Sequence, residues 1–274
     1  MVSLLNKCEI RLGYHSPNNT IRHYGSDKSG EKEYSFNSLG YRCDEFNPKS
    51  KENIFIAGCS YTLGVGLNSE ETWAYQFKKL LAEERKSELD EVGLMNFSVG
   101  GASNDYITRV LLSQSSLVKP DLIVAYFTHS SRTEYLDEEA IKMIGPWSVN
   151  LDFKGDKGTQ LHLDDLEDEA LSYYSYTTPE LEFVNMVKNM VLLQSYCKSS
   201  HINWVFASIY KDDLFSESHL SNPVCSRLLA LLDREHYCNS NIKIIDTAAD
   251  NSHPGPKSNK EFAEKIFETY KNCR

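Results

Sequence analysis

Hydrophobic and polar residues follow two different patterns along the chain. Residues 1–50 are polar and rich in turn-forming residues, so no apolar run there keeps a strand or helix period for long. From residue 53 onwards, short apolar runs alternate with longer amphipathic stretches, which is the pattern of βαβ units around a parallel sheet. The sequence therefore predicts an N-terminal leader of short strands and loops over residues 1–50, followed by one α/β domain over residues 51–274.

The alternation in the second part predicts a doubly wound domain. Five apolar runs are expected to be strands of a parallel sheet: residues 54–57, 94–97, 122–127, 204–207 and 242–245. Five amphipathic stretches are expected to be helices: residues 72–87, 104–115, 179–198, 223–236 and 258–272. In the last of these, apolar residues from Phe262 to Tyr270 recur every three or four positions and form one stripe.

The alternation lapses between residues 133 and 178. This region contains Trp147, several tyrosines and an acidic tract at residues 164–169. We interpret residues 133–178 as an insertion after the third strand. The acidic tract lacks the alternating ligand spacing and the glycine of a calcium-binding loop, so we expect it to be solvated surface.

Composition and charge restrict the class of protein. With 41% hydrophobic and 25% charged residues the chain is neither fibrous nor disordered. Its formal net charge of −10 disfavours binding to nucleic acid or to anionic membranes. The longest apolar run, residues 122–127, is far shorter than the about 20 residues of a membrane-spanning helix, and no secretory signal is visible. We expect a cytoplasmic protein without a membrane span.

Cysteine and glycine patterns argue against a metal or cofactor. The seven cysteines are odd in number, scattered and without a Cys-x-x-Cys pair, which predicts reduced thiols and no zinc knuckle. The glycine-containing segment at residues 58–66 lacks the Gly-Lys-Ser/Thr ending of a phosphate loop. We therefore expect no metal and no cofactor.

Polar segments follow four of the five expected strands. Because ligands bind beyond the carboxyl ends of parallel strands, these segments are the candidate site. They are Gly58-Cys59-Ser60-Tyr61-Thr62, Asn96-Phe97-Ser98-Val99-Gly100-Gly101, Thr128-His129-Ser130-Ser131-Arg132 and Asp250-Asn251-Ser252-His253-Pro254.

The residue types in these segments suit nucleophilic catalysis. A serine hydroxyl becomes a nucleophile when a nearby base takes its proton, and the base acts best when a third group fixes its tautomer. Asp250 and His253 are three residues apart, a spacing that lets the carboxylate accept a hydrogen bond from Nδ1. Nε2 would then face Ser60, and the backbone N–H groups of Ser60 and Gly101 would stabilise a tetrahedral intermediate.

Taken together, the segments resemble the SGNH/GDSL hydrolase family from about residue 54 to the C-terminus. Gly58-Cys59-Ser60-Tyr61-Thr62 is similar to the family's first block, Gly-Asp-Ser-x-Thr, with Cys59 in place of the aspartate. The segments ending at Gly101 and His253 are similar to the second and last blocks. The resemblance implies a flavodoxin-like three-layer α/β/α sandwich and a serine esterase or acyl-hydrolase. In that family's roles, Ser60 is the nucleophile, His253 the base, Asp250 its orienting carboxylate and Gly101 part of the oxyanion hole.

The third block departs from the family pattern. Gly-x-Asn-Asp falls on Thr128-His129-Ser130-Ser131, so Ser130 stands where an asparagine normally donates to the oxyanion. Losing such a donor lowers the rate by about 10²–10³, although a hydroxyl can still donate one hydrogen bond. Arg132 and Asn104 are further candidates for contacting the substrate. A leader segment, Asn37-x-x-Gly40-x-Arg42, resembles one that precedes the first block in some members, and we assign it no catalytic role.

Structural interpretations of the same residues remain open. Ser60 fits a helix cap, Gly100-Gly101 a tight turn, and Asp250 to Pro254 the start of the last helix with the aspartate as its cap. Arg132 fits a surface arginine that pairs with Glu134 or another carboxylate of the insertion.

Two neighbours of the candidate site have competing interpretations. His129 is a rival base, or a substrate contact, although no carboxylate stands at a short spacing from it. Cys59 is expected to be buried and to face away from Ser60, because successive strand side chains point to opposite faces.

The first functional hypothesis is a metal-free serine esterase that acts on a small-molecule or carbohydrate acyl ester. The alternatives are a catalytically weak or inactive binding or structural module of the same fold, and an O-acyltransferase. We expect residues 133–178 to fold over or beside the cleft, with Arg132 placed to meet a negative charge. The acyl chain, the alcohol and the oligomeric state do not follow from the sequence.

Overall fold

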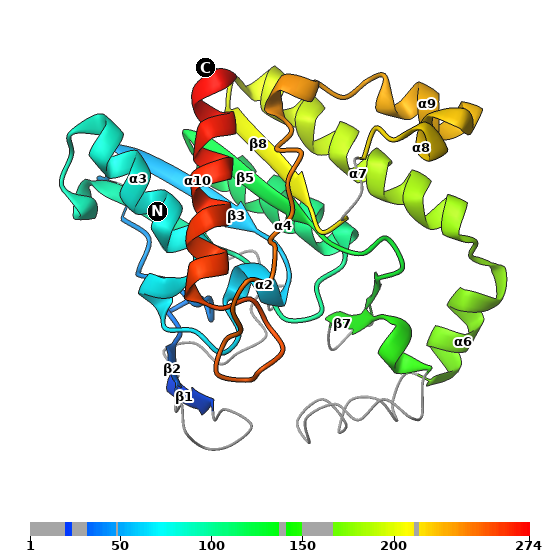
Figure 1. Ribbon diagram of the computed structural model, residues 1–274, viewed down its shortest axis with the longest axis horizontal. Helices are drawn as coiled ribbons and strands as arrows, with labels where there is room; N and C mark the ends of the chain where they lie inside the picture. The colour runs from blue at the N-terminus through cyan, green and yellow to red at the C-terminus, as the bar shows by residue number, and fades with distance from the viewer. Residues whose placement is uncertain (1–19, 24–31, 48, 137–140, 150–166, 211–213) are drawn as a thin grey trace.

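A four-stranded parallel sheet forms the centre of the computed structural model, which describes residues 20–23, 32–47, 49–136, 141–149, 167–210 and 214–274 (Figure 1). The strands lie in the order β4-β3-β5-β8. They are β3 (Glu52–Ala57), β4 (Val92–Asn96), β5 (Leu122–Phe127) and β8 (Asn203–Ser208). This is the flavodoxin-like order, in which the chain changes direction across the sheet between β3 and β5.

Helices cover both faces of the sheet, as the predicted three-layer α/β/α sandwich requires (Figure 1). One face carries α3 (Trp73–Arg85) and α10 (Pro256–Asn272). The other carries α4 (Asn104–Leu117) and α7 (Pro179–Ser200). These four helices begin and end within two residues of the predicted ones, because each has a long and regular apolar stripe.

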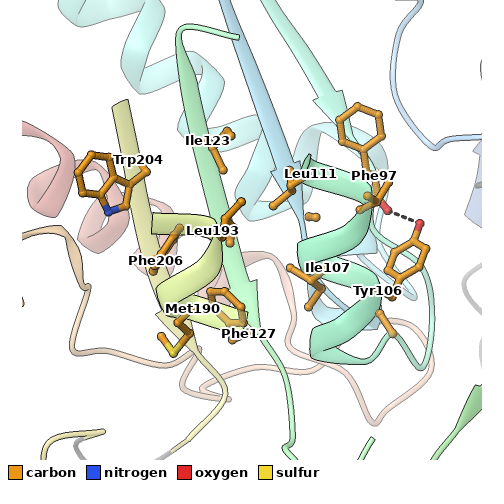
Figure 2. Packing of buried hydrophobic residues seen from close by; sticks show 14 of the residues in the cluster. Phe97, Tyr106, Ile107, Leu111, Ile123, Phe127, Met190, Leu193, Trp204 and Phe206 are labelled. Atoms are coloured by element: carbon orange, nitrogen blue, oxygen red, sulfur yellow. Dashed lines mark hydrogen bonds between the residues drawn. The ribbon is translucent and has the colours of Figure 1, made fainter. Parts of the chain in front are cut away.

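Strand β5 shows why the strands are continuous apolar runs. All six of its residues are buried, since both of its faces are covered. Ile123, Ala125 and Phe127 face the α4–α7 side, whereas Leu122, Val124 and Tyr126 face the α3–α10 side. Figure 2 shows the first of these layers, where the Tyr106 hydroxyl also donates to the Phe97 carbonyl at 2.8 Å.

Shorter elements surround this core. The leader contributes an antiparallel pair, β1 (Thr20–His23) and β2 (Lys32–Ser35). Between β5 and α7 lie a second antiparallel pair, β6 (Thr133–Leu136) and β7 (Ile141–Ile144), then η3 (Pro146–Ser148) and α6 (Glu167–Tyr176). The remaining short elements are α2 (Ser60–Leu63), η1 (Ser69–Glu71), η2 (Leu89–Glu91), α8 (Glu217–Ser221), α9 (Pro223–Leu229) and η4 (Arg234–His236).

The predicted fifth strand at residues 242–245 is wrong. Ile242 is buried, but Ile244 and Ile245 are 52% and 53% exposed, and the segment pairs with no described strand. The chain touches the sheet edge earlier, where the Cys238 N–H donates to the Phe206 carbonyl at 2.7 Å. One bridge there does not extend into a ladder, so four strands form the sheet in the described part of the chain.

The predicted helix at residues 223–236 is also wrong in its second half. Helix α9 ends at Leu229, and only the short η4 follows. Gln194 of α7 explains the break, because its side chain donates to the Leu231 carbonyl at 2.8 Å and accepts from the Asp233 N–H at 2.7 Å. These bonds occupy backbone groups that a continuous helix would use.

The remaining sequence predictions concern the leader, the insertion, the cysteines and a membrane span. Parts of the leader and of the insertion, including residues 164–166 of the acidic tract, lie outside the described residues. The six cysteines within the described ranges are free, and Cys59 is fully buried as predicted. None of the described helices has the length and apolar character needed to cross a bilayer.

Candidate active site

Ser60 lies in a tight turn between β3 and α2, residues 58–64, which we call the Ser60 turn. Cys59 has an extended backbone and stands immediately before α2, and Ser60 is the first residue of that helix. A Cβ atom on Gly58 would lie 2.1 Å from Thr62 Oγ1, so only glycine permits so tight a turn. Cys59 points into the core while Ser60 remains partly exposed at the carboxyl end of β3.

The loop after β4 is fastened to the Ser60 turn. The buried Asn96 amide donates to the Thr62 carbonyl at 3.1 Å, and the Val99 N–H donates to the Gly58 carbonyl at 3.4 Å. Gly101 follows with a φ of +73°, in the left-handed region that favours glycine.

Two backbone donors at this edge lack partners. Within the described part of the chain, neither the Ser60 N–H nor the Gly101 N–H donates a hydrogen bond. The first N–H groups of a helix have no acceptor in the helix itself, which accounts for Ser60. Both groups are therefore available to an oxygen atom of a ligand.

Asp250 and His253 contact each other in a closed turn, residues 247–254, which we call the Asp250 turn. His253 Nδ1 lies 2.5 Å from Asp250 Oδ2. Asp250 Oδ1 accepts from the N–H groups of Ser252 at 3.1 Å and of His253 at 3.0 Å. The Ala248 N–H donates to the His253 carbonyl at 2.8 Å and closes the turn.

The hydrogen bonds keep the pKa of Asp250 below its usual value. Burial raises the pKa of Asp250. The hydrogen bonds from the His253 ring and from the backbone N–H groups of His253 and Ser252 together outweigh burial and lower the pKa to about 2. Asp250 is therefore an ionised carboxylate directed at Nδ1 of His253, which leaves Nε2 as the second ring nitrogen for other contacts.

The interpretation of Asp250 as a helix cap is wrong. Helix α10 begins at Pro256, and its first N–H groups are bound by Asp246 instead. The Asp246 carboxylate accepts from the N–H groups of Lys257 at 3.0 Å and Ser258 at 2.9 Å. This leaves the Asp250 carboxylate to His253.

Direct contacts join the Asp250 turn to the chain around Ser60. The His253 ring packs edge to face against Tyr61, the neighbour of Ser60, with 5.6 Å between ring centroids. The Gly66 carbonyl accepts from the Ala249 N–H at 3.1 Å. Figure 1 shows the segment before α10 reaching the same end of the sheet as α2. The structure thus brings together the segments that carry Ser60, Asp250 and His253.

Asn259 fixes the segment between His253 and α10, a role that no sequence pattern predicts. Its buried amide donates to the carbonyls of Pro254 and Gly255, each at 3.0 Å. Its oxygen accepts from the N–H of Trp73 at 3.0 Å. One side chain thereby ties the first turn of α3 to the end of the Asp250 turn.

In the loop after β5, Ser130 contacts a residue that the sequence analysis did not single out. The Ser130 hydroxyl is hydrogen-bonded to the Tyr210 hydroxyl, and the Ser130 N–H donates to the same oxygen at 3.2 Å. Tyr210 follows β8 by two residues, so its position after a strand was the available signal. When the tyrosine oxygen accepts from the N–H and donates its own proton to Ser130 Oγ, the serine proton is left for a ligand.

Asn104 and His129 differ in their surroundings. Asn104 is buried, and its amide donates to the Thr128 carbonyl at 3.1 Å and accepts from the Thr128 N–H at 2.8 Å. It holds the loop after β5, so we do not include it among the substrate contacts. His129 is exposed by surface area, and partial desolvation by the surrounding chain together with the charge of Arg132 lowers its pKa. No described carboxylate pairs with His129.

Arg42 of the leader binds the end of the Ser60 turn and the residues that follow it. Its buried guanidinium donates to the carbonyls of Leu63 at 2.9 Å, Gly64 at 2.7 Å and Leu67 at 2.5 Å, and it stacks on Tyr34. Burial lowers the pKa of Arg42 to about 10. The Asn37-x-x-Gly40-x-Arg42 segment, given no catalytic role above, therefore has a positioning one.

Within the described ranges, no group of three or more histidine, cysteine, aspartate or glutamate side chains is arranged to hold a metal ion.

Comparisons with known proteins give similarities of fold. No family model and no curated protein matches the sequence. The psychrotrophic esterase EstA from Pseudoalteromonas sp. has a TM-score of 0.46 and 13% identity, over 81% of this chain and 97% of its own. TesA has a TM-score of 0.48 and 14% identity, over 80% and 98%. A lipolytic protein assigned to the G-D-S-L family from Desulfitobacterium hafniense DCB-2 has a TM-score of 0.43 and 8% identity, over 80% and 99%. The solved structures that this chain resembles in fold thus include an esterase and a G-D-S-L family protein.

Proposed function

We propose that this protein is a serine hydrolase that cleaves a small-molecule or carbohydrate acyl ester through an acyl-enzyme on Ser60. The observation that carries the proposal is the hydrogen bond between ionised Asp250 and His253 Nδ1, on a turn packed against Tyr61 beside Ser60. A histidine oriented by a carboxylate next to a serine at a strand end is the arrangement that serine acyl transfer requires. Its free cysteines fit a reducing compartment, and we propose the cytoplasm as the site of action.

Acylation begins with attack of Ser60 Oγ on the ester carbonyl carbon. His253 Nε2 takes the serine proton, and the carbonyl electron pair moves onto the oxygen. Asp250 stabilises the imidazolium that forms. When the tetrahedral intermediate collapses, the bond to the alcohol oxygen breaks and His253 returns the proton to that oxygen, so that an alcohol leaves.

Deacylation repeats these steps with water. His253 Nε2 takes a proton from the attacking water, and a second tetrahedral intermediate forms on the acyl carbon. Its collapse breaks the bond to Ser60 Oγ, which regains a proton from His253. The products are a carboxylic acid and the free enzyme.

The oxyanion would be bound by the N–H groups of Ser60 and Gly101, both without a partner among the described residues. Ser130 is the third donor in this proposal, with its hydroxyl oriented by Tyr210. Fixed donors aimed at a developing negative charge lower the barrier because they need no reorganisation during the reaction.

The test is the hydrolysis of short p-nitrophenyl esters by Ser60→Ala, His253→Ala and the double variant. We expect each single variant to lose about 10³-fold or more in kcat, and the double variant to lose no more than either, because the residues act as a unit. Ser69→Ala, which alters an exposed serine in η1, is the matched control. Undiminished turnover in a folded Ser60→Ala or His253→Ala protein would refute the proposal.

A further inference from the structure

Arg132 is a half-buried loop arginine whose guanidinium is held by two contacts. It follows β5 and Ser130, and its Nη1 donates to Thr128 Oγ1 at 2.9 Å. Its Cζ lies 5.0 Å from the ring centroid of Trp147, so that the guanidinium stacks on an indole. Such stacking holds the cation in place without neutralising it.

Arg132 also lacks the carboxylate partner that other arginines of the molecule have. Arg109 binds Glu134 with both branches of its guanidinium, at 2.9 and 2.7 Å, and Arg85 binds Glu52 at 2.7 and 2.8 Å. Glu134, the partner expected from sequence, is thus occupied. Arg132 forms no ion pair with any residue in the described ranges. Among the described residues, no carboxylate therefore neutralises this cation, although the chain as a whole carries a net charge of −10.

The stack of Arg132 on Trp147 adjoins the proposed oxyanion hole. A Cβ atom on Gly101 would lie 3.3 Å from Cζ2 of Trp147, so the indole edge contacts the oxyanion glycine. The charge of Arg132 also acts on the pKa values of Tyr61 and His129, which flank the site. It opposes the rise that burial causes in the pKa of Tyr61, and it adds to burial in lowering the pKa of His129.

We propose that Arg132, stacked on Trp147 beside Gly101, binds a carboxylate group of the ester substrate, so that the preferred substrates are esters bearing a negative charge. The inference rests on the proposed hydrolase function. A guanidinium presents a planar fork of donors that fits a carboxylate with two parallel hydrogen bonds. Within the described part of the chain, Nη1 donates to Thr128 and the other guanidinium N–H groups donate no hydrogen bond, so they can serve a ligand.

The experiment compares pairs of esters of equal size that differ in charge. Monoethyl succinate against ethyl succinamate places the charge on the acyl side, and 4-carboxyphenyl acetate against 4-carbamoylphenyl acetate places it on the alcohol side. The quantity measured is the ratio of kcat/KM for the anionic member to that for the neutral one. We expect the wild-type protein to prefer the anionic member in at least one pair, and Arg132→Gln to lower that ratio about 10- to 100-fold, mainly through KM.

Two further variants separate the local contact from net charge. Arg132→Lys keeps the charge but not the fork, and it should restore part of the ratio. Arg227→Gln removes the same charge from an exposed position on α9 and should leave the ratio as in the wild-type protein. A wild-type ratio at or below one in both pairs would overturn the proposal. An equal loss on both members in Arg132→Gln would also overturn it and would assign the residue to the oxyanion.

A binding measurement keeps this test separate from the hydrolase proposal. Tryptophan fluorescence of the Ser60→Ala protein, titrated with the same four esters, reports binding without turnover. We expect tighter binding of the anionic member of the preferred pair, and loss of that difference in Ser60→Ala/Arg132→Gln. If no ester is hydrolysed but this difference is present, the hydrolase proposal fails while the anion site stands. If the difference is absent, the anion site fails.

Discussion

At the scale of single residues, the site depends on a few polar side chains with fixed partners. Asp250 accepts three hydrogen bonds from within its own turn, and these hold it ionised beside His253. The charge that the proposed mechanism needs is therefore present before substrate binds. Preorganised charge of this kind contributes to catalysis because no rearrangement accompanies the reaction.

The lowered pKa of Asp250 predicts how stability changes with pH. Its pKa is about 2 in the folded protein and about 3.9 in an unfolded chain. Ionised Asp250 therefore stabilises the fold fully above about pH 4, and this contribution is lost as the pH falls through 2. We expect the free energy of unfolding in urea to fall less between pH 5 and pH 3 in Asp250→Asn than in the wild-type protein.

Asp90→Asn is the control for that comparison, because Asp90 is an exposed aspartate outside the site, without an ion-pair partner among the described residues. Identical losses between pH 5 and pH 3 in the wild-type and Asp250→Asn proteins would show that the bonds to Asp250 do not depress its pKa.

Residues with local partners were predictable, and residues with distant partners were not. Asp250 and His253 are close in sequence, so their spacing alone predicted the contact. Tyr210 meets Ser130 from a position 80 residues away, and Asn259 meets Trp73 from 186 residues away. No pattern in one sequence reports such pairs.

At the scale of elements, the Ser60 turn is shaped by the space that its neighbours leave. Gly58 faces Thr62 and Tyr126 so closely that any side chain must displace one of them. We expect Gly58→Ala to lower kcat/KM on a short ester at least about 10-fold and to destabilise the protein by about 1–3 kcal/mol.

The matched control for this substitution is Gly100→Ala. A Cβ atom at Gly100 would meet nothing within 4 Å, so this variant should retain both activity and stability. The measurements are steady-state kinetics and urea unfolding. Equal behaviour of the two variants would show that the close packing at Gly58 does not shape the turn.

Arg42 links the leader to the same turn. We expect Arg42→Met to destabilise the fold by about 2–4 kcal/mol, because three carbonyls lose a charged donor at once. If Arg42 positions Ser60, Arg42→Lys should lower kcat more than it raises KM, since a single ammonium nitrogen does not reproduce the fork of Nη1 and Nη2 that spans the three carbonyls. A stable Arg42→Lys protein with wild-type kcat would restrict Arg42 to a structural role.

Regular elements were predictable from sequence, and their exceptions have physical causes. The long apolar stripes of α3, α4, α7 and α10 predicted these helices within two residues. The run at residues 242–245 has strand-forming residues, but none of the described strands pairs with it. Helix α9 stops early because a side chain of another helix binds its backbone. Both exceptions depend on tertiary contacts.

At the scale of the whole molecule, the sheet is a rigid support with the candidate site at its carboxyl edge. Leu193 of α7 is fully buried in the layer that Figure 2 shows. We expect Leu193→Ala to cost about 2–5 kcal/mol of stability, measured by urea unfolding, with kcat/KM per folded molecule retained.

The neighbouring Leu192 supplies the control, since it lies on the same helix and is 53% exposed. Leu192→Ala should change the free energy of unfolding by less than about 0.5 kcal/mol. If both variants were equally stable, the layer between the sheet and α7 would contribute little to folding.

In the proposed mechanism His253 activates Ser60 as a nucleophile, and covalent labelling of the serine measures this activation. The folded protein is treated with a fluorophosphonate, and the modified peptide is identified by mass spectrometry. We expect stoichiometric phosphonylation at Ser60, with a rate at least about 10²-fold lower in His253→Ala because the serine then lacks its base. An unlabelled folded wild-type protein, or a label on a serine other than Ser60, would contradict it.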